Sequence, residues 1–207
     1  MGNPTVFIVD DDESLRDSVG CLLETVSIPF RMFSSAAEFL QVADPQWQGC
    51  LLLDVRMRGM SGMELLEKLE TDGAVRLPVI IFTGHGDVPM AVRALKHGAL
   101  DFLQKPFNGQ DLLDRIHAAF QLDRQNCLDR NNIAEQQARF DSLSPREKDV
   151  IELVVAGNSS KVIGQKLGIS CKTADIHRSN IMKKFNAKTV AELVKCRMAL
   201  KQSGSAG

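Results

Sequence analysis

The chain has 207 residues, with 26 acidic side chains, 25 basic ones and a formal net charge of −1, and this length allows two small domains with hydrophobic cores. It contains no apolar stretch near the length of a membrane span and no charged-then-apolar signal segment. We therefore expect a cytoplasmic protein that does not associate with membranes. Five cysteines without metal-ligand spacing favour free thiols, and three of them lie in apolar runs typical of core positions: Cys21, Cys50 and Cys196.

The two halves of the chain differ in charge. Residues 1–123 carry 18 acidic and 10 basic side chains, whereas residues 141–207 carry 6 acidic and 12 basic ones. Residues 124–140 are nearly neutral, with 3 basic and 2 acidic side chains. An acidic half joined to a basic half indicates that only the second meets a polyanion, and double-stranded DNA is the leading candidate.

The first half alternates short apolar runs with amphipathic helical patterns. Runs of this kind, bounded by polar residues, are typical of buried strands in a parallel sheet, and they are Thr5–Val9, Cys50–Leu53, Pro78–Phe82 and Asp101–Gln104. Helical spacing of apolar residues follows each turn region, beginning near Leu15, Ala36, Met63, Val88 and Leu112. The alternation predicts βαβ units in an α/β domain over residues 1–123. We expect a flavodoxin-like, doubly wound sheet of five parallel strands.

Charged and polar residues end these strands. Asp10 and Asp11 follow the first run, Asp54 the second, Thr83 the third and Lys105 the fourth. Because ligands bind at the carboxyl ends of parallel strands, we expect these side chains to share one crevice. Taken singly, an aspartate after a strand is more often a helix N-cap or a turn residue. Clustered carboxylates repel one another unless a cation sits among them, and Mg²⁺ prefers such oxygen ligands.

This set of residue types is suited to phosphoryl transfer, which needs an aligned nucleophile, a metal and positive charge near the phosphoryl oxygens. Asp54 is the candidate nucleophile, and Asp11, helped by Asp10, is the candidate Mg²⁺ ligand. Lys105 is placed to pair with the phosphoryl group, and Thr83 to donate a hydrogen bond to it.

Four segments in this half resemble a known family. They are Asp10-Asp11, the run from Asp54 to Gly62, Thr83 to Asp87, and Phe102 to Phe107. Together they resemble a bacterial response-regulator receiver domain of the NarL/FixJ family, and most closely its FixJ-like branch, over roughly residues 4–122. One position departs from the commoner receiver pattern, since Arg58 stands where proline is frequent.

The resemblance implies a role for each site residue. Asp54 would be the phospho-acceptor, and the metal site would comprise Asp10, Asp11, Asp54 and the backbone carbonyl of Arg56. Thr83 and Lys105 would sense the phosphoryl group, and Phe102 would be the aromatic switch residue. The metal would be Mg²⁺, for which Mn²⁺ can substitute. The protein would not be an enzyme beyond its own Mg²⁺-dependent phosphorylation and dephosphorylation at Asp54.

The joint between the halves lacks glycine and proline from Asp111 to about Arg139. We expect the last helix of the first domain to continue into a helical linker over residues 124–140. Its apolar stripe is sparse and weakly supports a coiled coil: Leu122, Leu128 and Ile133. A flexible, partly helical joint is the alternative.

The second half predicts a small all-α helix-turn-helix domain over residues 141–201, followed by a flexible polar tail at 202–207. Ser144 at the N-cap, Pro145 at the first helical position and Glu147 at the third form a capping box. Further helices are expected over 159–167, 172–185 and 190–198. A short helix, a turn containing Gly168 and a basic helix make a helix-turn-helix.

Three segments of this half resemble the LuxR-type DNA-binding domain, namely 143–150, Ala156-Gly157 and 172–184. The resemblance implies that residues 172–184 form the recognition helix, with Arg178, and less directly Asp175 and His177, approaching base edges. Ile176 and Ile181 are expected in the core. The phosphate-contact candidates are Lys161, Lys172, Lys183, Lys184 and Lys188, with Thr173 as a further DNA-facing residue. Gly164 inside a helix is expected to cost roughly 1 kcal/mol relative to alanine.

The combined resemblance implies a two-component response regulator and transcription factor. Its partners would be a sensor histidine kinase, promoter DNA, RNA polymerase and, after phosphorylation, a second copy bound through the surface around Val88 to Phe102. One alternative is a phosphorylation-independent DNA-binding protein with a vestigial receiver. The other is an aspartate-nucleophile phosphatase, which usually has a second carboxylate two residues after the nucleophile, where this chain has Arg56.

Overall fold

The computed structural model describes residues 3–73, 75–84 and 88–203. Its contacts divide the chain into two compact units, Met1–Cys127 and Leu128–Gly207. Each unit has its own hydrophobic core. The predicted division into residues 1–123, 124–140 and 141–201 remains a prediction about domain boundaries.

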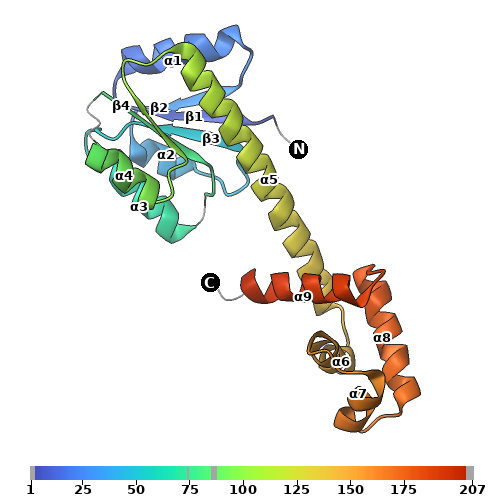
Figure 1. The fold of residues 1–207 in the computed structure, drawn as a ribbon. Coiled ribbons are helices and arrows are strands. Elements are labelled where there is room, and N and C mark those ends of the chain that lie inside the picture. Colours follow the sequence, from blue (N-terminus) through green and yellow to red (C-terminus); the bar gives the residue numbers. More distant parts are fainter. Residues whose placement is uncertain (1–2, 74, 85–87, 204–207) are drawn as a thin grey trace. The chain divides into compact units, whose positions relative to one another are not determined.

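The first unit is built on a five-stranded parallel sheet (Figure 1). The strands are β1 (Thr5–Val9), β2 (Phe30–Phe33), β3 (Gly49–Leu53), β4 (Val79–Thr83) and β5 (Asp101–Gln104). They lie in the order β2-β1-β3-β4-β5, and every neighbouring pair is parallel. This is the doubly wound, flavodoxin-like order that the alternating pattern predicts. The edge strand β2 has no continuous apolar run, because exposed Arg31 interrupts it, and the sequence pattern did not locate it.

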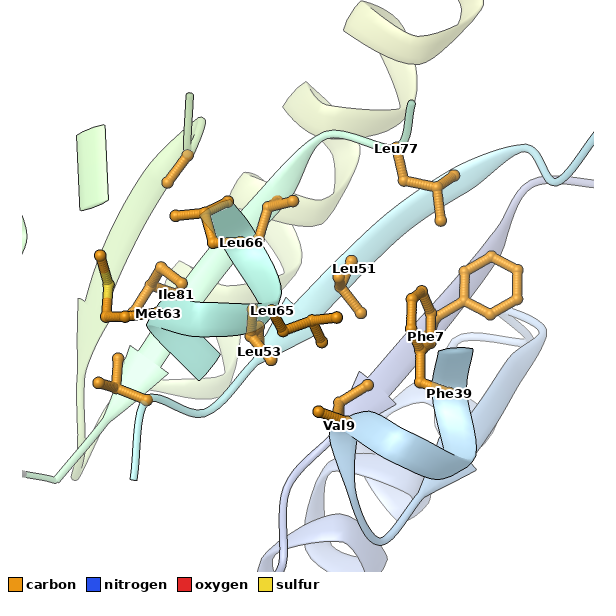
Figure 2. Packing of buried hydrophobic residues seen from close by; sticks show 14 of the residues in the cluster. Phe7, Val9, Phe39, Leu51, Leu53, Met63, Leu65, Leu66, Leu77 and Ile81 are labelled. Carbon is orange, nitrogen blue, oxygen red and sulfur yellow. The ribbon is translucent and has the colours of Figure 1, made fainter. Parts of the chain in front are cut away.

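Helices cover both faces of this sheet (Figure 1). They are α1 (Glu13–Thr25), α2 (Ala36–Val42), α3 (Gly62–Asp72), α4 (Val88–Lys96) and the first part of α5 (Gly109–Asp141). The buried residues of α1 and α5 form one core cluster with one face of the sheet. Those of α2, α3 and α4 form a second cluster with the opposite face. Figure 2 shows the second cluster, to which α2 contributes Phe39, α3 contributes Leu65 and β3 contributes Leu51.

In the second unit, residues 128–203 form helices joined by short turns. The unit contains the end of α5, then α6 (Pro145–Val155), α7 (Ser160–Leu167), α8 (Cys171–Phe185) and α9 (Val190–Ser203). One buried cluster joins α6, α7, α8 and α9, with Val150, Ile163 and Ile181 among its fully buried members. The α7–α8 turn passes through Gly168, whose φ of 66° favours glycine. The predicted helices and the turn of the helix-turn-helix are therefore confirmed.

Gly164 has a packing role that the sequence pattern did not reveal. A Cβ atom at this position would lie 2.7 Å from the carbonyl oxygen of Ile169, in the turn that follows α7. The expectation that alanine would be better by roughly 1 kcal/mol is wrong for this backbone, because the close approach penalises any side chain here.

Two predictions of burial are also wrong. Ile176 is 53% exposed on α8, whereas Ile181 is fully buried as expected. Cys21 is exposed on α1, although Cys50 is buried and Cys196 is half-buried. Neighbouring apolar residues in the sequence do not determine which side of a helix faces the core, and both residues lie on outward sides of their helices. All five cysteines are free thiols.

The joint residues 124–140 all lie within α5, a helix of 33 residues. Within the part of the chain that the structure describes, no helix is both long and apolar enough to cross a bilayer.

Candidate functional site

Two nearly buried carboxylates lie side by side at the carboxyl edge of the sheet. Asp10 directly follows β1 and Asp54 directly follows β3, and these strands pair in register, with Val9 opposite Leu53. The backbone amide of Asp54 donates to the carbonyl oxygen of Val9, at 2.9 Å. Asp10 is 1% exposed and Asp54 is 5% exposed. Adjacent parallel strands therefore bring the predicted pair together, away from water.

The Lys105 ammonium bridges these two carboxylates. Its Nζ lies 2.6 Å from Oδ2 of Asp10 and 2.9 Å from Oδ1 of Asp54. Lys105 follows β5, and its backbone amide donates to the carbonyl oxygen of Thr83, at 2.9 Å. The ammonium also lies 4.4 Å from the centre of the buried Phe82 ring. The cluster thus contains one positive charge shared between two acidic groups, which offsets part of their mutual repulsion.

The environment of Asp54 raises the pKa of its carboxyl group above the ordinary value. Burial is the main cause, because it disfavours the charged form, and the nearby Asp10 adds to it. The hydrogen bond and the charge of Lys105 oppose this shift, as does the backbone amide of Arg56, which donates to Oδ2 of Asp54 at 2.7 Å. Asp54 is therefore a poorly solvated carboxyl group held by directed hydrogen-bond donors.

The third carboxylate lies at the rim of the site. Asp11 is half-buried, and its Oδ2 accepts a hydrogen bond of 3.2 Å from the backbone amide of Arg58. The Arg58 guanidinium is almost fully exposed and lies 3.7 Å from the same oxygen. The residue that departs from the commoner receiver pattern thus contacts the acidic cluster directly, a contact that sequence spacing did not indicate.

Gly62 fixes the loop that follows Asp54. A Cβ atom on Gly62 would lie 1.9 Å from the carbonyl oxygen of Asp54. The amide of Gly62 donates to the carbonyl oxygen of Val55, at 3.0 Å, and Ser61 caps α3 through a capping box with Glu64. The start of α3 therefore packs against the backbone of the acidic residue, and only glycine fits there.

Thr83 and Phe102 lie on the neighbouring strands. Thr83 ends β4 and is buried, and Phe102 on β5 is half-buried and pairs in register with Ile81. The Phe102 ring packs against the core cluster that contains Ala94 of α4. The predicted switch residue therefore lies on the α4 side of the sheet. His85, which follows Thr83 closely in sequence, lies outside the described residues.

The donor atoms of this cluster suit a hard divalent cation. Asp10, Asp11 and Asp54 carry carboxylate oxygens, which are the ligands that Mg²⁺ prefers. Over residues 3–73, 75–84 and 88–203, no three acidic, histidine or cysteine side chains are arranged as a ready metal cluster. The cation that Asp10 and Asp54 share is the Lys105 ammonium.

In the second unit, a buried and charged capping box lies at the start of α6. Ser144 accepts from the amide of Glu147, and Glu147 accepts from the amide of Ser144. Glu147 is 5% exposed, and its Oε2 lies 2.7 Å from Nζ of Lys184. Burial acts to raise the pKa of the Glu147 carboxyl, but the hydrogen bond from Lys184, the hydrogen bonds with Ser144 and the charge of Lys184 together hold that pKa below its ordinary value. Lys184 therefore joins α8 to the start of α6 as well as being a candidate phosphate contact.

The predicted DNA-contacting residues divide into exposed and half-buried sets. The exposed ones are Lys161, Lys172, Asp175, Lys183, Lys184 and Lys188. Thr173, His177 and Arg178 are half-buried. The Arg178 guanidinium lies 3.3 Å from Oγ of Ser160 and 3.5 Å from the carbonyl oxygen of Asn158, so it contacts the start of α7. The structure thus brings the acidic site together but distributes the predicted base-contacting residues around α8.

Comparison with known proteins matches both units. Residues 6–117 match the family of response regulator receiver domains, and residues 141–197 match the bacterial regulatory proteins of the luxR family. The transcriptional regulatory protein TdiR of Thauera aromatica is 44% identical over 92% of this chain and 83% of its own length. The transcriptional regulatory protein FixJ of Azorhizobium caulinodans is 42% identical over 94% of this chain and 91% of its own length.

Solved structures show the same relationship. The response regulator StyR has a TM-score of 0.80 and 42% identity, covering 95% of this chain and 99% of its own. Full-length FixJ from B. japonicum has a TM-score of 0.58 and 36% identity, covering 98% of this chain and 99% of its own. The similarity spans both units in each case.

Proposed function

Because the chain belongs to the FixJ-like two-component response regulators, which regulate transcription through a LuxR-type DNA-binding domain, we propose that phosphorylation of Asp54 controls its binding to promoter DNA. A receiver domain implies a sensor kinase as partner, and a LuxR-type domain implies binding to DNA. The observation that carries the proposal is the near-burial of Asp54 beside Asp10, with the Lys105 ammonium hydrogen-bonded to both carboxylates.

In the transfer step, a carboxylate oxygen of Asp54 attacks the phosphorus of a phosphohistidine on the sensor kinase. The P–N bond breaks, the histidine keeps the electron pair and takes a proton, and an acyl phosphate forms on Asp54. Receiver domains generally use Mg²⁺, which would neutralise phosphoryl charge here. Asp10, Asp11, Asp54 and the backbone carbonyl of Arg56 are the residues we assign to hold it, with Mn²⁺ as a substitute. Lys105 is bonded to the carboxylate that becomes phosphorylated, so it is placed to follow the new charge.

The switch is expected to run from Asp54 through Thr83 and Phe102 to α4. A phosphoryl group shifts the domain only if it interacts differently with its two conformations. The Thr83 hydroxyl and the Lys105 ammonium are the groups that can make this difference. Their inward movement would let the half-buried Phe102 ring repack beneath α4, where it already contacts the core around Ala94.

The surface that this movement changes is apolar and exposed. Val92 and Leu95 on α4 are 45% and 49% exposed, and Leu100 before β5 is 36% exposed. We assign this surface to a homodimer formed on phosphorylation. A dimer would present two copies of the helix-turn-helix to two half-sites separated by whole helical turns of DNA. In the cytoplasm, RNA polymerase is then the partner through which the bound dimer would act on transcription.

The experiment that tests this proposal is intact-protein mass measurement with a parallel sizing run. Wild type and Asp54→Asn are each incubated with Mg²⁺ and acetyl phosphate. We expect wild type alone to gain one phosphoryl group and to become a dimer. Modification of both proteins would assign the acceptor to another residue. Modification of neither, while a control receiver reacts, would favour the alternative of a phosphorylation-independent DNA-binding protein.

A further inference from the structure

The outward face of the recognition helix is defined by the residues that α8 buries. Ala174, Ile181 and Phe185 are buried in the core of the second unit. At 100° per residue these three positions cluster on one side of the helix. The opposite side then carries Lys172, Ile176, Ser179 and Lys183, and all four of these residues are exposed.

Ile176 lies at the centre of this face. It is the aliphatic member of an otherwise polar stripe, and it is 53% exposed. Single exposed aliphatic residues are ordinary on protein surfaces, so exposure alone assigns no role. Its position between two lysines on the side of α8 opposite the core is the observation that points to a ligand.

Arg178 lies on the other side of the helix. It is half-buried, about 40° of rotation from Ala174, and its guanidinium reaches Ser160 and the carbonyl oxygen of Asn158. Thr173 is likewise engaged within the unit, because its hydroxyl lies 2.8 Å from that of Ser170 at the helix start. Arg178 therefore joins α8 to the start of α7, and Thr173 takes part in the cap of α8.

The spacing of the lysines matches the dimensions of DNA. Lys172 and Lys183 are 11 positions apart, which corresponds to about 16 Å along a helix. The major groove of B-DNA is about 12 Å wide, so these two side chains can reach phosphates on its opposite sides while Ile176 faces the groove floor. An aliphatic side chain at the floor recognises the C5-methyl group of thymine, the one apolar feature that base pairs present there.

We propose that Ile176 is a specificity-determining residue that contacts the methyl group of one thymine in each half-site. The exposed Asp175 beside it is placed to accept a hydrogen bond from the amino group of a neighbouring cytosine. The inference rests on the proposed insertion of α8 into the major groove. It replaces Arg178 by Ile176 as the central residue of the reading face.

The test removes one methyl group at a time from the DNA. Full-length wild type, treated with Mg²⁺ and acetyl phosphate, selects its preferred duplex from a random pool, and each thymine of that duplex is then replaced by uracil. We expect one replacement per half-site to weaken binding by about fourfold, the effect of one buried methyl group. In Ile176→Ala the same replacement should have no effect, and Ile176→Val should retain part of it.

The matched control is Val190→Ala, which truncates another exposed β-branched residue of the same unit. It should keep the full response to uracil. Ile176→Ala should keep the thermal stability of wild type and its affinity for random DNA, since the side chain is outside the core. An equal loss with uracil in wild type and Ile176→Ala, or no sensitive thymine at all, would overturn the inference.

This design separates the inference from the proposed function. A wild type that selects a duplex only after treatment with acetyl phosphate, but shows no methyl dependence, contradicts only the role of Ile176. A wild type that selects the same duplex equally well without acetyl phosphate, and shows the methyl dependence, contradicts only the control by phosphorylation. A wild type that selects no sequence under either condition contradicts both.

Discussion

Replacing Lys105 by methionine removes the cation that Asp10 and Asp54 share while keeping a side chain of similar length. The ammonium lies 2.6 Å and 2.9 Å from the two carboxylates. The exposed fractions of the side chains are 18% for Lys105, 2% for Asp10 and 7% for Asp54. The substitution therefore leaves two facing acidic groups that water barely reaches.

The expected cost follows from this burial. Removing one partner of a buried ion pair typically costs about 3–5 kcal/mol. We expect the free energy of unfolding to fall by about 3 kcal/mol at pH 8, the lower end of that range. The loss is limited because Lys105 is not fully buried and one carboxyl group can take up a proton. With a urea dependence of about 2 kcal/mol per molar, the unfolding midpoint should fall by about 1.5 M.

The cost should depend on pH in a defined direction. In wild type, burial raises the pKa of Asp54, so the folded state binds this proton more tightly than the unfolded chain does. The stability that such a group contributes to the folded protein is lost as pH rises from its unfolded pKa through its folded pKa. Lys105 opposes the shift, and its removal should raise the pKa of Asp54 further. The difference between Lys105→Met and wild type should therefore grow from pH 4 to pH 8.

Trp47 provides a specific assay for the first unit. It is the single tryptophan of the chain, and its ring stacks on Phe7 with centroids 4.2 Å apart. Urea unfolding followed by its fluorescence reports the receiver unit, and Lys68→Met on the exposed surface of α3 is the matched control. A midpoint for Lys105→Met equal to that of this control at pH 8, or a difference that shrinks as pH rises, would refute the reasoning.

Three further substitutions test other parts of the molecule. Ser144→Ala removes the side-chain cap of α6 and should cost about 1 kcal/mol, seen as faster amide hydrogen exchange in the first turn of that helix; unchanged exchange would contradict it. Gly62→Ala places a Cβ atom against the carbonyl oxygen of Asp54. It should lower the free energy of unfolding by at least about 2 kcal/mol in urea and slow phosphorylation as followed by intact mass. A normal phosphorylation rate would mean that the loop tolerates displacement. Val92→Glu should change the free energy of unfolding by less than about 0.5 kcal/mol and leave phosphorylation intact, but it should prevent dimerisation in a sizing run. A phosphorylated Val92→Glu dimer would show that the interface lies on another surface.

The sequence predicted the acidic site well because strand topology determines it. Asp10 and Asp54 follow adjacent parallel strands, so their proximity follows from the strand order. The capping box of Ser144 and Glu147 is likewise local, and it forms as predicted. The pairing of Glu147 with Lys184 is 37 residues distant in sequence, and no spacing rule reveals it.

The sequence does not predict which residues of α8 are buried. Residues 172–184 mix apolar and polar side chains, so their period alone does not fix the buried side of α8. The sequence predicts Ile176 in the core, but Ala174, Ile181 and Phe185 form the buried side of α8 and Ile176 is exposed. The buried side of α8 is determined by its packing against α6 and α7, and the sequence of the helix alone does not contain this information.

The close contacts of glycine are also invisible in the sequence. Gly62 and Gly164 each approach a backbone carbonyl oxygen, from Asp54 and Ile169 respectively. A helical glycine alone predicts only lost stability relative to alanine. The tertiary approach of another chain segment reverses that expectation.

The central claim is that phosphorylation of Asp54 controls binding to promoter DNA. The most direct measurement is the affinity of full-length wild type and Asp54→Asn for the selected duplex, with Mg²⁺ and with or without acetyl phosphate. Salt concentration is held constant, since it strongly affects binding to DNA. We predict that acetyl phosphate increases the affinity of wild type at least about tenfold, the gain of a modest allosteric coupling, and leaves Asp54→Asn at the unphosphorylated level. Equal affinities for both proteins under both conditions would contradict the account.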